Sequence, residues 1–568
     1  MSRSGCHPLR WAVLAWALPA LPARPASAPD RGEVTMMDPV FVEASAGNPW
    51  RYIAGPGFEI ISRCPEAFNE AYARSLQREA AARLALLPAG FWGQLASPIK
   101  IVLYNRPPEP GQGVGASSPI DLAWEPGDGA LLDSGSLEFA HPVTVGDGDT
   151  FINCGNYWNT QSETGDLSVD PGSALLLENR VPRFPAWFIA GLVGPRGLYV
   201  NHVVRSGPLG DSLVLPNAVW VSYAETVAMQ DEARRKDGAG APRRRPALLA
   251  LDELLRGSAS GDERETWNAE AALFVRWGLF ASGQRQAFLD FVDATTREPA
   301  SEALFREHLG MGFDAAARGL EGYLPAAVSE AISVPIDAAQ PDVPEVRDAM
   351  SSEVARIIGD WGRMEGRDLG PQYAEFRRQC LDQADQQFER AIARRANDPL
   401  FLAAYGLYRL QAGEETKAFE ALDAATRAGV VRPRAYVELA RLRLERALPA
   451  VQQGIGDLGE PEFEGILGLL TTARLQMPAL VGTYHVLAQT LEHAPRIPAP
   501  EDMAALDTAL RLFPRDARLA YRVATLYQRL GDPAKASSVI ARASAFADSA
   551  QARALLASFP AARSLPAR

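Results

Sequence analysis

The sequence predicts an α+β N-terminal region followed by an all-α array of helical repeats. Three observations support this fold class. Strand-like and helix-like patterns mix before residue 330, prolines crowd the stretch 334–345, and almost every apolar pattern after it has helical spacing. We therefore expect an N-terminal domain over 38–330, a linker and connecting helix over 331–370, and helical repeats over 371–568. The length of 568 residues suits two to four domains.

The N-terminal region begins with alternating strand and helix patterns. Phe58–Ile61 is predicted to be a short strand, Glu66–Leu87 has the apolar spacing of a helix, and Lys100–Tyr104 is predicted to be a second strand buried on both faces. Residues 105–150 are rich in Gly, Pro, Asp and Ser, which predicts long loops. Further helices are expected at 173–180, 185–194, 216–230, 247–256, 265–281, 284–295 and 313–323.

A repeat of 34 residues begins at Pro399, and a second copy begins at Pro433. In the first copy, apolar or small residues stand at positions 4, 7, 8, 15, 20, 24 and 27, and this pattern resembles the tetratricopeptide repeat, or TPR. Small residues at positions 8 and 20 let the two helices of a pair approach closely, and larger residues at 4, 7 and 24 fill the space between pairs. These residues are Leu402, Tyr405, Gly406, Gly413, Ala418, Leu422 and Ala425.

Two further copies begin at Val481 and Ala517. The second copy is stretched by about 14 residues near 451–461, between its two helices. A helix pattern over 373–395 should pack on the first copy, and residues 548–558 should cover the last. An unrelated antiparallel helical array is the alternative.

The N-terminus is typical of a signal peptide over residues 1–28. Arg3 and Arg10 supply positive charge, Trp11–Leu21 is apolar, and small residues follow. We expect export, to the periplasm or outside the cell. No later segment reaches 18 apolar residues, so we expect no transmembrane anchor in the mature chain.

The formal net charge of −12 argues against a nucleic-acid partner, because phosphate backbones require a broad basic face. One basic run occupies 234–236 and 243–245 around small residues, which is typical of a solvated loop. Cys64 and Cys154 fall in the same predicted domain. In an oxidising compartment they could form a disulfide, and the alternative is two separate thiols.

One segment carries part of a peptidase motif. Residues 185–192 read Pro-Ala-Trp-Phe-Ile-Ala-Gly-Leu, which resembles the Pro-x-Trp-Leu-x-Glu-Gly-Leu segment of gluzincin-type zinc peptidases, a family often fused to TPR repeats in bacterial proteins. Residues 251–255, 267–280 and 310–324 resemble later segments of that family. The resemblance implies a degenerate gluzincin-like domain. Its third zinc ligand, a glutamate, is replaced here by Ala190.

The other two zinc ligands are absent as well. The family's His-Glu-x-x-His would fall on Asp170–Ala174 or, with a shorter gap, on Leu177–Val181, where only Glu178 remains. Two histidines one helical turn apart are needed to reach one metal. We therefore predict no zinc, no other cofactor and no gluzincin catalytic residues. The histidines after residue 28 are His141, His202, His308, His485 and His493.

Other catalytic patterns are weaker still. Asp133, Ser134 and His141 have the residue types of a serine hydrolase but lack a Gly-x-Ser-x-Gly elbow. Residues 155–158, Gly-Asn-Tyr-Trp, could face a ligand, although a buried aromatic at a strand end explains them more simply. The chain has no phosphate-binding loop motif.

Three functions remain open. The first is a non-catalytic protein whose TPR-like concave surface binds a protein or peptide. The second is a hydrolase with a rebuilt site, which would bring Asp170 and Glu178 together with shifted pKa values. The third is an envelope assembly scaffold, which would self-associate through an exposed apolar patch.

Overall fold

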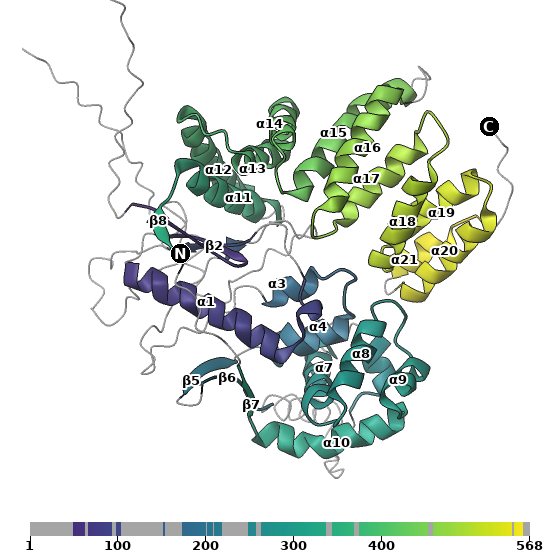
Figure 1. Ribbon diagram of the computed structural model, residues 1–568. Helices are drawn as coiled ribbons and strands as arrows, with labels where there is room; N and C mark the ends of the chain where they lie inside the picture. Colours follow the sequence, from purple (N-terminus) through teal and green to yellow (C-terminus); the bar gives the residue numbers. More distant parts are fainter. Residues whose placement is uncertain are drawn as a thin grey trace, which may run out of the picture. The chain divides into compact units, whose positions relative to one another are not determined.

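The computed structural model describes most of the chain beyond residue 48 (Figure 1). The predicted signal peptide over 1–28, Cys64, Cys154 and the basic run over 234–245 lie outside the described residues. The described residues are 49–62, 66–93, 98–103, 152–153, 173–199, 202–207, 210–218, 248–256, 263–336, 344–368, 374–452, 458–547 and 550–560.

A five-stranded sheet opens the described chain, in the order β4-β3-β2-β1-β8. Strands β1 (Arg51–Gly55) and β2 (Phe58–Ser62) form an antiparallel hairpin, and the helix α1 (Glu66–Leu86) connects β2 to the parallel strand β3 (Ile99–Leu103). The strand β4 (Ile152–Asn153) extends the sheet beyond β3. The predicted strands at 58–61 and 100–104 and the predicted helix at 66–87 are confirmed within one or two residues at each end.

The fifth strand corrects the predicted linker. Strand β8 (Val346–Asp348) pairs antiparallel with β1, although it lies almost 300 residues later in the chain. Strand β7 (Ile332–Pro335) includes the first residues of the proline-rich stretch and pairs with β6. Pro335 is compatible with this strand because β7 lies at a sheet edge and the proline is its last residue.

The second sheet has the order β5-β6-β7 and contains a hairpin that was not predicted from the sequence. Strands β5 (Val203–Gly207) and β6 (Gly210–Leu215) pair antiparallel. Gly210 has a φ angle of 111°, a conformation that favours glycine at the start of β6.

The helices of the described N-terminal region pack into one apolar core, in which Trp187, Phe274 and Phe288 are buried. Helix α9 was not predicted, although Ser301 caps its start and Gly310 ends it with a φ angle of 68°. The predicted helix at 216–230 falls mostly outside the described residues. The helices of this core are α1, α3 (Ser173–Glu178), α4 (Ala186–Val193), α6 (Leu251–Arg256), α7 (Glu263–Phe280), α8 (Arg285–Ala294), α9 (Glu302–Leu309) and α10 (Phe313–Ser329).

The rest of the described chain is helical. Helix α11 (Ser351–Asp368) packs against α12 (Ala374–Ala393), and four further helical pairs follow. In each of the four pairs, the first helix begins at the residue where the sequence count placed a repeat. The pairs are α13 (Pro399–Gln411) with α14 (Glu415–Arg427), α15 (Pro433–Gln452) with α16 (Glu460–Leu475), α17 (Val481–Glu492) with α18 (Pro500–Leu512), and α19 (Ala517–Arg529) with α20 (Pro533–Phe546).

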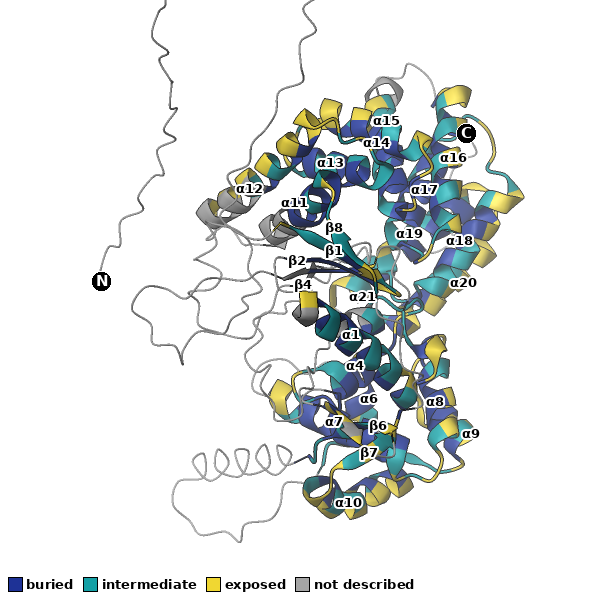
Figure 2. Cartoon of the chain, turned by 60° about the vertical axis from the view of Figure 1, so that its left-hand side comes forward, coloured by how far each residue is buried: buried dark blue, intermediate teal, exposed yellow. Residues whose placement is uncertain are grey.

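Helix α21 (Ala550–Ala557) follows the last pair and packs on α19 and α20. Buried residues line the facing sides of the helices, and exposed residues lie on their outer sides (Figure 2). The residues at position 8 of the four repeats, Gly406, Ala440, Ala488 and Ala524, are all buried. None of the helices in the described parts of the chain combines the length and the apolarity needed to cross a membrane.

Candidate binding site on the helical array

The peptidase-like segment is a structural element of the core. Pro185 precedes helix α4, and Trp187 is 1% exposed and packs against Phe274 and Phe291. A Cβ atom on Gly191 would lie 2.5 Å from the backbone oxygen of Ala271, so α4 and α7 touch through their backbones. The Pro, Trp and Gly of this segment thus serve helix packing.

The donors that a zinc ion needs do not come together in the described residues. Ala190 stands where the family places its third ligand, and α3 precedes it without a histidine. Within the described ranges there is no group of three or more His, Cys, Asp or Glu side chains that could hold a metal ion. The described residues at this position do not fit a zinc ion.

Each of two histidines is held by a carboxylate. His202 lies 2.8 Å from Glu79 through Nε2 and 2.7 Å from the backbone oxygen of Tyr199 through Nδ1, and both side chains of the His202–Glu79 pair are buried. His485 lies 3.0 Å from Asp516, which also caps helix α19. These contacts explain the two histidines as parts of the packing.

Several catalytic candidates from the sequence lie outside the described residues. They are Asp133, Ser134, His141, Asp170 and residues 155–158. Glu178 ends helix α3, but its side chain is not among those described. The rebuilt hydrolase site therefore stays a hypothesis.

Buried charged side chains gather elsewhere, where the first sheet meets α11. We call this set the buried charge network. It was not predicted from the sequence, because its members come from β2, β3, α11 and the residue before α15, and each is less than a tenth exposed. Its members are Glu59, Lys100, Arg356, Asp360, Arg363 and Arg432.

Burial would raise the pKa of Asp360, but the guanidinium groups of Arg432 and Arg363 outweigh it and lower the pKa to about 2. Burial lowers the pKa of Lys100 to about 7, although the negative charge of Glu59 acts to raise it. For Glu59 itself, burial acts to raise the pKa, and the charge of Arg356 outweighs it and lowers the pKa. Because these groups are enclosed and satisfy one another, we interpret the network as structural.

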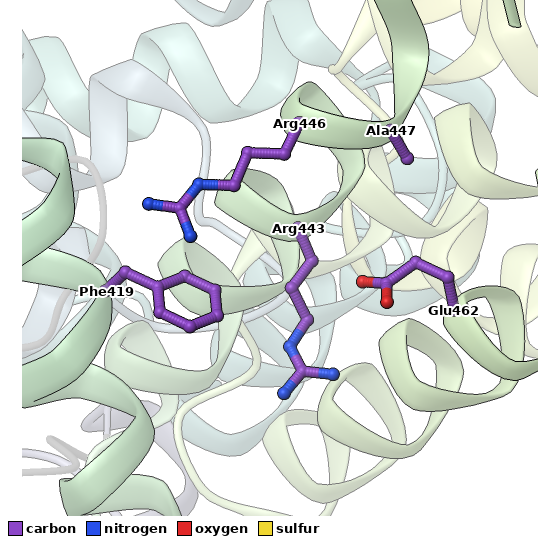
Figure 3. Close-up of a pocket in the computed structure, with 5 residues that line it drawn as sticks. All are labelled: Phe419, Arg443, Arg446, Ala447 and Glu462. Atoms are coloured by element: carbon purple, nitrogen blue, oxygen red, sulfur yellow. The ribbon is translucent and has the colours of Figure 1, made fainter. Parts of the chain in front are cut away.

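An open pocket of about 430 Å³ lies on the helical array, between α14, α15 and α16 (Figure 3). Phe419 comes from α14, Arg443, Arg446 and Ala447 from α15, and Glu462 from α16. Helix α15 has 20 residues, whereas α13 and α19 have 13 each, and Arg446 and Ala447 stand at the start of this extension. The stretched second repeat thus supplies one wall of the pocket.

Arg446 is the exposed cation of the pocket. Its guanidinium carbon lies 4.1 Å from the centre of the Phe419 ring, and Nη2 donates a long hydrogen bond of 3.4 Å to the backbone oxygen of Glu415. No carboxylate among the described residues lies within ion-pairing distance of Arg446. A cation stacked on a ring keeps its edge free to bind an anion.

Arg443 is more firmly held. Its Nη2 lies 3.3 Å from Asp423 Oδ1, and its Nε is buried without a hydrogen-bond partner in the described structure. Glu462 adds an acceptor from the third helix. The two guanidinium groups can bind a carboxylate of a ligand, and the aromatic face can cover an apolar side chain beside it. The Glu462 carboxylate can accept a hydrogen bond from a backbone N–H of the same ligand.

The array is TPR-like. One solved structure, a thermophilic TPR protein of Thermus thermophilus, is similar to this chain at a TM-score of 0.26 and 21% identity, over 35% of this chain and 97% of that chain. Neither the protein-family models nor the curated proteins gave a match. The description of the array as TPR-like rests on its paired helices, their start residues and the small buried residues at position 8.

Proposed function

We propose that this chain is an exported, non-catalytic binding protein whose TPR-like array binds a segment of a partner protein. The pocket formed by Phe419, Arg443 and Arg446 carries the proposal, because it joins an exposed cation, which has no carboxylate partner among the described residues, to an aromatic face. An acidic side chain with an apolar neighbour fits this combination. The ring would cover the apolar atoms, and Arg446 would bind the carboxylate.

The N-terminal region supports the non-catalytic part of the proposal. It carries the peptidase-like segment at 185–192, but that segment is buried packing and has Ala190 in place of the glutamate. We propose that the peptidase-like domain was retained as a scaffold. Export rests on the composition of residues 1–28 alone.

A peptide titration tests the binding site. The probe is a fluorescein-labelled peptide of alternating Glu and Leu, and fluorescence anisotropy reports its binding to the full chain. We expect Arg446→Glu to weaken binding by about tenfold or more, because it replaces an attraction by a repulsion. Arg511→Glu is the matched control, since Arg511 lies on α18, away from the pocket, donates a hydrogen bond to Thr508 and undergoes the same charge change.

A peptide of alternating Lys and Leu should bind weakly to the unmodified chain. Equal affinity for the two peptides, or equal losses with Arg446→Glu and Arg511→Glu, would refute the pocket as the binding site. Elemental analysis after purification without chelator tests the non-catalytic part separately. One zinc ion per chain would refute it and would call for a hydrolase assay.

A further inference from the structure

The buried charge network joins three parts of the chain that are distant in sequence. Arg356 of α11 donates to Glu59 of β2 through both terminal guanidinium nitrogens, Nη1 and Nη2, at 2.7 and 3.1 Å. One turn further along α11, Asp360 accepts a hydrogen bond of 2.8 Å from Arg432, the residue before helix α15. A single helix therefore connects the first sheet to the second repeat of the array.

Lys100 carries the network across the sheet, and Tyr52 is hydrogen-bonded to the network. The hydroxyl of Tyr52 donates to Glu59 Oε1 at 2.8 Å, and Lys100 is the register partner of Glu59 on the neighbouring parallel strand. Lys100 is 1% exposed. Charged side chains are buried this fully only when each has its partners. Removing a carboxylate from the network therefore leaves a buried cation without its balancing charge.

Helices α11 and α12 pack like a repeat of the array. A Cβ atom on Gly359 of α11 would lie 2.4 Å from the ring of Phe388 of α12, just as one on Gly406 of α13 would touch Leu422 of α14. Helix α11 also contacts α13, the first helix of the next pair. The array thus begins one pair earlier than the sequence count indicated, at Ser351.

A terminal pair of a helical solenoid has no neighbour on its outer side, so that side is normally polar and faces water. On α11, the buried residues Arg356 and Asp360 carry charges that would suit such a surface, yet both are at most 4% exposed. The sheet covers α11, which contacts β3 and β4, and Glu59 supplies the matching charge. Figures 1 and 2 both show the first sheet beside α11.

We propose that the first sheet is the N-terminal cap of the helical array, and that the sheet and the first helical pairs open as one cooperative unit. As a cap, the α/β region has a structural role that requires no catalytic metal. The proposal does not depend on what the array binds, because it concerns the coupling between β2 and α11–α13.

Hydrogen exchange of the full chain, followed by mass spectrometry, tests this coupling. Glu59→Gln keeps the shape of the side chain and leaves Arg356 buried without its carboxylate. We expect backbone amides in 351–411 to exchange about tenfold faster, while those of α19 and α20 are unchanged. Asp348→Asn is the control, since it breaks the exposed Arg51–Asp348 ion pair in the same sheet.

Coupling must act in both directions, so Arg432→Met should speed exchange in β2 and β3. Should Glu59→Gln fail to fold, Tyr52→Phe removes a single hydrogen bond to Glu59 and provides a milder version of the experiment. Faster exchange confined to β1–β3, with 351–411 unchanged, would overturn the proposal. So would equal effects of Glu59→Gln and Asp348→Asn on 351–411.

Discussion

Gly406 of α13 lies directly against Leu422 of α14: a Cβ atom on the glycine would be 2.7 Å from Leu422 Cγ and 3.2 Å from its backbone nitrogen. The two residues occupy positions 8 and 24 of the first repeat. A small residue was expected at position 8 so that the two helices could approach closely, and the structure confirms it.

We predict that Gly406→Val destabilises the protein by about 1–3 kcal/mol, because the branched side chain would overlap with the backbone and side chain of Leu422. Urea unfolding followed by circular dichroism measures the change. Gly468→Ala is the control, since a Cβ there meets no atom within 4 Å and the substitution should stabilise helix α16 by up to about 1 kcal/mol. Equal effects of the two substitutions would contradict the close crossing of α13 and α14.

Asp360 makes the stability sensitive to acid. Its pKa is held at about 2 in the folded protein and stands at 3.8 when unpaired. A lowered carboxyl pKa contributes stability above the unfolded value, and that contribution, about 2 kcal/mol, is lost as the pH falls from about 4 toward 2. Asp360→Asn should remove this part of the acid sensitivity and destabilise the protein at pH 7. An unchanged acid transition in the variant would argue against the pairing of Asp360 with Arg432.

Lys100 has an effect of the same sign at high pH. Its pKa is lowered from 10.5 to about 7 by burial, so between these values the unfolded chain binds more protons than the folded one. Stability should therefore rise with pH across this window, by up to about 1.4 kcal/mol per pH unit. Unfolding in urea at about pH 7 and about pH 9.5 measures the rise. Lys100→Met should flatten it, and a slope that persists in the variant would assign the effect to other groups.

Trp187 tests the core of the described N-terminal region. We predict that Trp187→Ala costs about 3–5 kcal/mol, because the side chain is 1% exposed among aromatic rings. Trp187→Phe should cost much less. It keeps most of the ring contacts and removes an indole N–H that has no hydrogen-bond partner in the described structure. Thermal unfolding of the two variants side by side gives the comparison, and similar losses would show that the indole itself is required.

Ala190→Glu introduces the glutamate that gluzincin-type peptidases carry in the motif that residues 185–192 resemble. We still expect no stoichiometric zinc, because a single carboxylate cannot replace the missing pair of histidines. Elemental analysis of the variant after incubation with zinc provides the measurement. Uptake of one zinc ion would mean that further ligands come from outside the described residues.

Much of the array could be predicted from the sequence. Pro399, Pro433, Val481 and Ala517 each begin a helix where the repeat count placed them, because apolar spacing, and at some starts a capping residue, lie within a few residues of the helix start. Helix α9 was missed although Ser301 and Gly310 mark its ends. The hairpin at 203–215 was missed because its strands are short and only partly buried.

The candidate pocket was not predictable in the same way. The extra length of the second repeat was visible in the sequence, but it was placed near 451–461, beyond Arg446. The stacking of Arg446 on Phe419 depends on how α14 and α15 pack, which no local pattern specifies.

The helical repeats and the absence of a zinc peptidase motif could be derived from the sequence, since both depend on which residues stand at short, fixed spacings. Three features appeared only in the folded chain: β8 pairs with β1, α11 links Glu59 to the residue before α15, and the predicted linker is partly strand. These contacts join residues far apart in the chain. Their free energy depends on which distant residues come together, and the choice of partner leaves no periodic pattern in the sequence.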